Sequence, residues 1–310
     1  MVDVMGHVRT AIESVIEGKT DQVNIALAVL LAEGHLLVED VPGVGKTMLA
    51  RALGRSIDCS VRRLQFTPDL LPSDITGVSV YNQESREFEF KPGAIFANIV
   101  VGDEINRASP KTQSALLEAM AERQVSADGI THHLASPFMV VATQNPIEME
   151  GTYPLPEAQR DRFMARIEMG YPTRASELDM LDSHGATSPL EELHPVTDAD
   201  TVVDLARTVK TVYVAPAVKD YIVGVVAATR QSKDLRLGAS PRASLHLLRI
   251  VRAQAALAGR DYVIPDDVQA LAPVVLGHRL LPSVQAQLAG RTVHEIIEAA
   301  VETVAIPDRR

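Results

Sequence analysis

A glycine-rich stretch carries the first residues whose types and spacing could do chemistry: residues 39 to 47 read EDVPGVGKT. Glycines at 43 and 45 would let backbone amides turn onto phosphate oxygens. Lys46 would reach the terminal phosphates, and the Thr47 hydroxyl would be placed for Mg²⁺. A glycine normally begins such a loop, and Asp40 holds that place here, so the effect of this acid is an open question. The expected contacts of the nucleotide are Val41, Pro42, Gly43, Val44, Gly45, Lys46, Thr47 and Met48.

Two adjacent acids form a second pattern, in IVVGDEINRA at residues 99 to 108. Asp103 and Glu104 follow an apolar run, and a parallel sheet presents the carboxyl ends of its strands to the ligand crevice. Asp103 would hold the Mg²⁺, directly or through water, and Glu104 would take a proton from the attacking water. The alternative is that both acids are surface charges after a core strand.

Alternating strands and helices must position these residues. Helical periodicity predicts two helices before residue 34, and further helices at 46–57 and 110–122. Short apolar runs predict four buried strands, at 35–39, 61–66, 94–103 and 137–143. This alternation predicts an α/β fold, with a parallel sheet covered by helices on both faces.

The character of the chain changes after about residue 172, where a polar stretch leads into helical periodicity without a run of strands. We expect an αβα nucleotide-binding core at 1–175 and a smaller all-helical second domain at 176–310, which the chain enters through a segment at about 173–205. Its clearest helix begins after Ser240 and ends at Gly259, with Leu245, Leu248 and Val251 on one face. Another begins near Ile264. HRLLP at 278–282 gives no chemical signal beyond a helix end.

Composition narrows the class of protein. The 310 residues carry a formal net charge of −10, which disfavours binding to a nucleic acid polyanion. Cys59 is the only cysteine, so no internal disulfide can form, and apolar runs such as residues 25–32 are too short for a bilayer span. The cytoplasm is therefore the expected location. His132 and His133 fall in an expected hairpin, where neighbouring residues point to opposite faces and do not share a metal.

Several longer runs together resemble the MoxR family of AAA+ ATPases. They are the loop itself, RRLQFTPDLLPSDITG, VVGDEINRASPKTQSALLEAMAERQV and VVATQNPIEMEGTYPLPEAQRDRF, which cover most of residues 35–175. GASPRASLHLLR extends the resemblance, more weakly, into the C-terminal half. The resemblance implies a Mg²⁺-dependent ATPase with a P-loop core and a helical lid.

The resemblance also implies roles for single residues. Asn145 matches a sensor that orients the attacking water, although a buried amide could instead cap a turn. Arg162 matches an arginine finger that reaches the γ-phosphate of a neighbouring subunit. Arg160 departs from the family pattern, so either arginine could be the finger, and either could be a surface cation. Arg242 matches the sensor arginine of the lid, and Arg107 could face the next subunit or form an ordinary salt bridge.

An arginine that acts in trans requires a head-to-tail ring or helix of subunits, and the resemblance favours a hexamer. It further implies work on a protein client, partners with a von Willebrand factor A domain, and a helix-2 insert near residues 78–92. We expect a chaperone-like remodeller that assists maturation or assembly of other proteins. The alternatives are a nucleic-acid motor of a related AAA+ clade and a nucleotide-gated binding scaffold.

Overall fold

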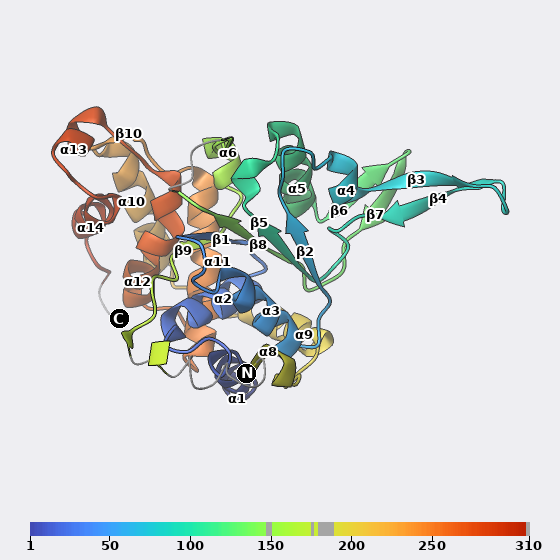
Figure 1. Ribbon diagram of the computed structural model, residues 1–310. Helices are drawn as coiled ribbons and strands as arrows, with labels where there is room; N and C mark the ends of the chain where they lie inside the picture. Colours follow the sequence, from blue (N-terminus) through green and yellow to red (C-terminus); the bar gives the residue numbers. More distant parts are fainter. Residues whose placement is uncertain (147–150, 175–176, 179–188, 308–310) are drawn as a thin grey trace.

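A parallel sheet of five strands, in the order β2-β5-β8-β1-β9, forms the centre of the computed structural model (Figure 1). The structure describes residues 1–146, 151–174, 177–178 and 189–307. Every strand pairs in parallel with its neighbours, so all carboxyl ends lie at one edge of the sheet. The strands are β1 (Leu36–Glu39), β2 (Val61–Gln65), β5 (Ile99–Asp103), β8 (Met139–Gln144) and β9 (Ala165–Ile167).

Side chains on the two faces of the sheet belong to two separate hydrophobic clusters. Leu36 and Val38 belong to one cluster, and Leu37, between them in sequence, belongs to the other. Val100 and Val101 divide in the same way, because successive residues of a strand point to opposite faces. A sheet buried on both faces requires near-continuous apolar strands, which explains why these strands are recognisable in the sequence.

Helices cover both faces. The first cluster also contains buried residues of α1, α2 and α3, and the second contains buried residues of α4 and α5. The helices that precede the C-terminal region are α1 (Val2–Glu13), α2 (Thr20–Leu31), α3 (Lys46–Ser56), α4 (Pro72–Thr76), the 3₁₀ turn η1 (Ile105–Arg107), α5 (Pro110–Glu122) and α6 (Glu157–Arg160). The αβα core is therefore confirmed.

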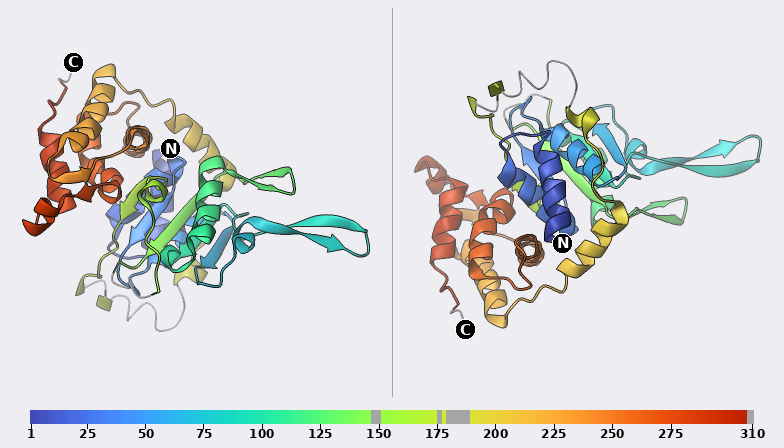
Figure 2. Two further views of the ribbon diagram at one scale, coloured as in Figure 1. Left: turned by 90° about the horizontal axis from the view of Figure 1, so that it is seen from above. Right: turned by 90° about the horizontal axis from the view of Figure 1, so that it is seen from below.

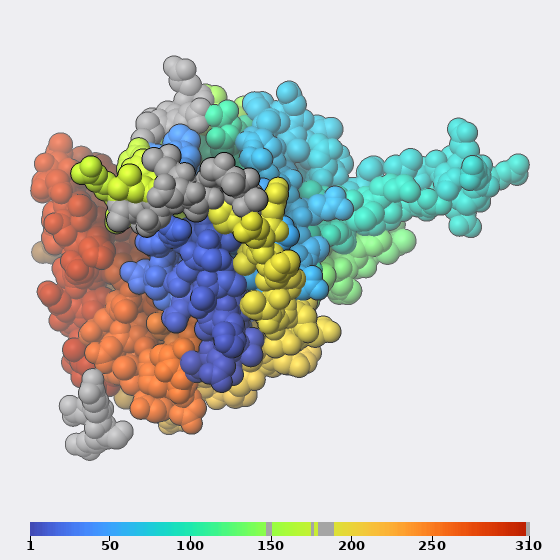
Figure 3. Space-filling view, turned by 60° about the horizontal axis from the view of Figure 1, so that its bottom comes forward, coloured from blue at the N-terminus to red at the C-terminus, as the bar shows by residue number. Residues whose placement is uncertain are grey.

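Two antiparallel hairpins extend from one end of this core. The longer one, β3 (Gly77–Asn82) with β4 (Glu87–Pro92), occupies the segment expected as the insert and projects far from the body (Figures 1 and 3). The shorter one, β6 (Gln124–Ala127) with β7 (Ile130–His133), confirms the expected hairpin. His132 stacks on Phe90 of the longer hairpin, with ring centroids 3.9 Å apart, so the two hairpins touch.

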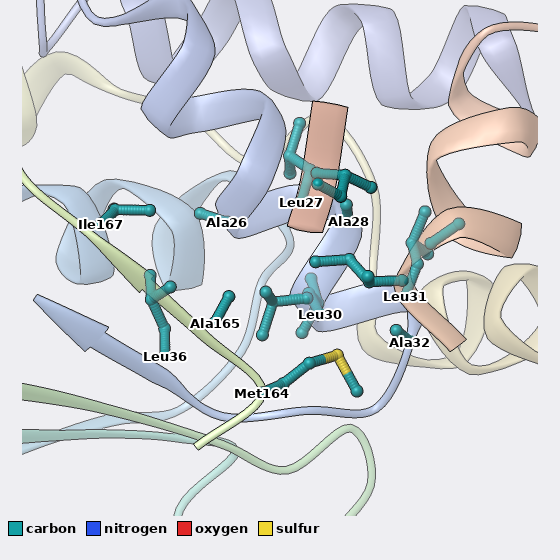
Figure 4. Close-up of a cluster of buried hydrophobic side chains, with 14 of the residues drawn as sticks. Ala26, Leu27, Ala28, Leu30, Leu31, Ala32, Leu36, Met164, Ala165 and Ile167 are labelled. Carbon is teal, nitrogen blue, oxygen red and sulfur yellow. The ribbon is translucent and has the colours of Figure 1, made fainter. Parts of the chain in front are cut away.

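The described residues from 189 on are helical apart from short strand pairings such as the antiparallel ribbon β10–β11, and the helices from α10 on lie at the end of the molecule away from the hairpins (Figure 2). Helix α11 packs on α2, and the side chains of α2 fill the space between β9 and the C-terminal helices (Figure 4). The elements of this C-terminal region are α8 (Pro189–Glu192), α9 (Ala199–Val209), α10 (Pro216–Gln231), β10 (Leu235–Leu237), α11 (Pro241–Leu257), α12 (Pro265–Leu276), η2 (Gly277–Arg279), β11 (Leu281–Pro282), α13 (Val284–Leu288) and α14 (Val293–Glu302).

Three details differ from the expectations. The strand expected at 94–103 begins only at Ile99, because the N–H groups of Ala94 and Ile95 bond to carbonyls at the end of α4 and not to the sheet. The short strand β9 was not expected. Leu245 of the expected face of α11 is 58% exposed, whereas Val251 of that face is buried, together with Leu247 and Ile250, so the buried face is rotated from the expected one.

The division between core and lid at residues 175 and 176 falls outside the described residues, as do residues 147–150 of the family-like run. The domain division therefore stays a prediction. Within the described ranges, none of the helices combines the length and apolar character that a membrane crossing requires.

Candidate active site

The glycine-rich loop joins β1 to α3 at the carboxyl edge of the sheet. Gly43 and Gly45 both have φ of +87°, which residues with a side chain rarely adopt, and a Cβ built at either would point into open space. A loop of this shape leaves backbone amides accessible at the N-terminus of α3, where the helix dipole favours an anion. The local geometry therefore fits a phosphate group.

Lys46 begins α3, and main-chain carbonyl oxygens hold its side chain. Its ammonium donates to the oxygens of Asp40 at 2.6 Å and Gln144 at 3.4 Å. Burial lowers the pKa of Lys46, while the nearby carboxylates of Asp40, Glu104 and Asp103 oppose that shift. The cation thus lies at the loop, with acceptors that a phosphate oxygen could replace.

Thr47 and Asp103 converge beside Lys46. The Thr47 hydroxyl lies 3.0 and 3.3 Å from the two carboxylate oxygens of Asp103, which is 5% exposed. Arg63 also donates to Asp103, at 2.5 Å. A hydroxyl and a carboxylate are hard oxygen donors, the type that Mg²⁺ prefers. This donor pair fits the metal, and the structure brings together the two residues expected to hold it.

Glu104 follows directly, in an uncommon backbone conformation. Its φ of 57° and ψ of 51° lie in the left-handed region, and its N–H donates to the Thr143 hydroxyl at 3.0 Å. One carboxylate oxygen, Oε2, accepts from both Gln65 and Arg107, each at 3.0 Å. Strain of this kind in a non-glycine residue is typical of functional sites, since the surroundings must hold it in place.

Thr143 was missed by sequence reasoning, although it joins both acids. It accepts the N–H of Glu104 and donates to the Asp103 carboxylate at 3.3 Å. Asn145 lies two residues further on, just past the end of β8, and is 9% exposed. The carboxyl ends of β1, β5 and β8 thereby gather Lys46, Asp103, Glu104 and Asn145 at one edge, although the assigned roles stay predictions.

Asp40 does not point its carboxylate freely at the loop. One of its oxygens accepts the N–H of Val41 at 2.7 Å, and the other accepts the N–H of Gly170 at 2.5 Å. Lys19 reaches the same segment from the N-terminal helices and donates to the carbonyls of Gly170 and Tyr171. The acid therefore ties the start of the loop to the chain that leaves β9.

A hollow of about 210 Å³ adjoins the loop, and its other walls were also missed. Apolar Val15 and Ile16 come from the turn between α1 and α2, and Pro172 follows β9. Such a half-apolar hollow next to a phosphate loop suits a planar base. Its full lining is Ser14, Val15, Ile16, Glu17, Lys19, Gly43, Val44, Gly45, Met48, Pro172 and Pro189.

Arg162 and Arg242 lie elsewhere. They line one common hollow with Gly34 and His35, which precede β1, so this hollow is at the amino edge of the sheet. β1 has four residues and spans roughly 13 Å between that edge and the loop. Arg162 donates to the carbonyl of Leu117 in α5, while Arg242 lies exposed in the first turn of α11. The structure does not bring these two arginines to the loop of their own chain.

The other two arginines are separate from this hollow. Arg160 ends α6, is half-buried and does not line the hollow; its Nε atom has no hydrogen-bond partner among the described residues. Arg107 pairs with Glu104 in its own chain. The two candidate fingers thus differ in their surroundings, because Arg162 lines the hollow beside Arg242 and Arg160 does not, while the choice between them stays a prediction.

HRLLP does carry a chemical signal, contrary to the expectation. The side chain of Arg279 is 2% exposed and pairs with Asp161 at 2.8 Å, and the adjacent His278 is buried as well. Burial lowers the pKa of Arg279 to about 10, although Asp161 opposes the shift, so the guanidinium is charged at neutral pH. A cation inside apolar surroundings requires an acidic partner. The leucines that follow Arg279 could have indicated that the arginine is buried and therefore has such a partner.

The sheet order, the loop after β1 and the paired Thr47 and Asp103 define a P-loop nucleotide-binding protein of the AAA+ type. Comparison with known proteins agrees. The family described as "ATPase family associated with various cellular activities (AAA)" matches residues 35–165, and the "AAA lid domain" family matches residues 227–300.

Relatives narrow the class further. The chain is 51% identical to the uncharacterized protein YeaC of Bacillus subtilis, over 99% of this chain and 96% of that one. It is 43% identical to Chaperone MoxR1 of Mycobacterium tuberculosis, over 96% and 80% of the two chains. A crystal structure from Cytophaga hutchinsonii, 37% identical, superposes with a TM-score of 0.91 over 99% of this chain and 96% of that one. The protein belongs to the MoxR family of AAA+ ATPases.

Proposed function

We propose that this protein hydrolyses ATP at a site shared between adjacent subunits of a head-to-tail assembly. The observation that carries the proposal is the separation of the candidate residues onto two edges of one sheet. Lys46, Asp103 and Glu104 lie at the carboxyl edge, whereas Arg162 and Arg242 lie together at the amino edge. A single chain therefore holds two incomplete halves, which a heterologous contact between copies would complete.

Each residue of the first half has a definite task. The loop amides and Lys46 bind the phosphates, and Thr47 and Asp103 hold the Mg²⁺ ion. Bound Mg²⁺ would neutralise charge on the phosphate oxygens. Glu104 accepts the proton of the attacking water, and Asn145 orients that water. The hydrogen bonds of Glu104 to Gln65 and Arg107 hold its carboxylate close to the sheet edge.

The second half acts on the neighbour. Arg162 supplies positive charge to the γ-phosphate of the adjacent subunit as negative charge develops there. Arg242 lines the same hollow, so it would face the same phosphates as Arg162 in such an assembly. Turnover then depends on the angle between subunits, which allows the assembly to convert hydrolysis into movement. A closed hexameric ring is the arrangement that we propose.

We further propose that this movement remodels other proteins during their maturation or assembly. The support is the similarity to Chaperone MoxR1, together with the long hairpin β3–β4, whose Phe88 is 74% exposed. Proteins with a von Willebrand factor A domain are candidate partners. The net charge of −10 makes a nucleic acid substrate unfavourable.

The test is ATP turnover per subunit as a function of protein concentration. Wild type should become more active as concentration rises, and Arg162→Ala should lose that rise, because the finger comes from the neighbour. Arg207→Ala, which removes an exposed arginine of α9, is the matched control and should behave as wild type. Equal specific activity at all concentrations would contradict the shared site.

A second variant tests the base. Glu104→Gln should bind a fluorescent ATP analogue with wild-type affinity while turnover falls by about 10²-fold or more. With ATP bound, Glu104→Gln also provides a trap that retains client proteins. A client captured in this way should stimulate ATP turnover when the purified client is added to the wild-type protein. Stimulation by duplex DNA at physiological salt would instead favour the nucleic-acid motor.

A further inference from the structure

We propose that Asp161 and Arg279 are positioning residues that hold Arg162 and Arg242 as one unit facing the neighbouring subunit. This inference rests on the proposed shared site, because it assigns a function to the support of the two arginines. Asp161 directly precedes Arg162, whereas Arg279 is far away in sequence, in η2 of the C-terminal region. The first observation is that the Asp161 carboxylate contacts both parts of the chain.

The two oxygens of Asp161 have different partners. One accepts from the Nε atom of Arg279 at 2.8 Å, and the other accepts from the Ser240 hydroxyl at 2.8 Å. Ser240 is the N-cap of α11 and lies two residues before Arg242. A single carboxylate therefore connects the segment of Arg162, the helix start of Arg242 and the buried guanidinium.

The guanidinium of Arg279 donates mainly to the backbone on either side of Arg162. Its acceptors there are the carbonyls of Asp161 at 3.3 Å, Phe163 at 2.5 Å and Met164 at 3.3 Å. The neighbouring His278 bonds to the same Phe163 carbonyl at 3.1 Å. These bonds fix the backbone from which the Arg162 side chain extends.

Arg279 also contacts α11 itself. Its Nη2 atom lies 2.6 Å from Nδ1 of His246, which is one turn after Arg242 in the same helix. Burial lowers the pKa of His246 to about 2, and the nearby cations of Arg279 and Arg249 act in the same direction. His246 is thus neutral and accepts from Arg279. The guanidinium therefore joins the two segments that carry the candidate trans-acting arginines.

This arrangement differs from a pair that only adds stability. A rigid link between the segments means that any rotation of α11 and η2 also moves residues 161–164, and with them Arg162. Without the link, each arginine would retain its charge and its place in the sequence, but the pair would lose its fixed geometry. Misplacement by about 1 Å can reduce a catalysed rate by about 10²-fold.

The test uses Asp161→Asn, which conserves shape and removes the charge, and Arg279→Lys, which conserves charge and removes the planar fork. The matched control is Asp267→Asn, because Asp267 makes a two-point ion pair with Arg260 within the C-terminal region. We expect all three variants to melt earlier. Only the first two should lower saturated turnover per folded subunit, by about tenfold or more, with nucleotide affinity unchanged.

Mixed assemblies provide the decisive readout. Glu104→Gln has an intact arginine half, and Asp161→Asn has an intact phosphate half, so a mixture should regain activity. Random mixing in equal amounts gives about a quarter of wild-type turnover, because one interface in four combines both intact halves. Arg279→Lys should be rescued in the same way, which keeps the test valid if Asp161→Asn folds poorly.

The outcomes separate the two proposals. If Arg162→Ala is rescued by Glu104→Gln but Asp161→Asn and Arg279→Lys are not, the positioning role is wrong while the shared site stands. Equal turnover in Asp161→Asn and Asp267→Asn would also overturn it. If Arg162→Ala is not rescued either, the shared site fails, and the positioning role fails with it.

Discussion

Replacing Asp40 should destabilise the protein, although a glycine would match the usual loop pattern better. The carboxylate accepts the N–H groups of Val41 and Gly170, at 2.7 and 2.5 Å, so Asp40→Ala leaves two backbone donors without their acceptor. A hydrogen bond to a charged group contributes about 1.5–3 kcal/mol when buried. Water can partly replace an acceptor at this half-buried position, so we expect a total loss of about 1–3 kcal/mol.

Chemical denaturation of Asp40→Ala measures this loss, with the exposed Asp69→Ala as the matched control. Asp40→Asn should be destabilising as well, because its amide presents an NH₂ group to one of the two N–H donors. A change in unfolding free energy below about 0.5 kcal/mol relative to the control would refute the assigned tie, since that is the range of ordinary surface substitutions.

Two further predictions concern the loop and the core. Gly45→Ala should lower the affinity for a fluorescent ATP analogue in a titration, because φ at residue 45 is +87° and the added Cβ would enter the space that the phosphates approach. The control is Gly6→Ala in α1, where an added Cβ also meets no neighbouring atom, and this variant should bind the analogue normally. Burial lowers the pKa of His35 to about 4, below its unfolded value of 6.5. The contribution of the neutral, buried imidazole to the free energy of unfolding is therefore complete above pH 6.5 and is lost as pH falls toward 4. This pKa shift corresponds to about 3 kcal/mol of unfolding free energy. Urea unfolding between pH 6.5 and pH 4 should therefore show a shallower pH dependence of that free energy in His35→Gln than in the wild type.

The sequence was sufficient wherever a local pattern determines structure. Helix α5 was expected at 110–122 and spans Pro110–Glu122, because Ser109 caps it and Pro110 begins it. The loop and the two acids were placed at the ends of β1 and β5, as buried parallel strands require. Each of these predictions depends on neighbours within a few residues.

The prediction from sequence was wrong where residues distant in sequence form the backbone hydrogen bonds. The apolar residues Ile95 and Ala97 are buried as a strand would be, yet the N–H of Ile95 bonds to the carbonyl of Ile75. Composition alone cannot separate the two arrangements, because both bury the same side chains. β9 is only three residues long, which is too short to show a period of two.

The support of the arginines is the clearest case of information that lies between distant segments. The resemblance indicated Arg162 as the candidate finger, with Arg160 as the alternative, but what Asp161 does depends on Arg279, 118 residues away in sequence. One signal was present: His278 and Arg279 interrupt an otherwise apolar stretch, and a buried cation must have an acidic partner. The sequence could therefore have predicted that a partner exists, whereas only the fold identifies that partner as the residue beside the proposed finger, Arg162. That placement makes the pair a candidate link between the C-terminal helices and the neighbouring active site, beyond its contribution to stability.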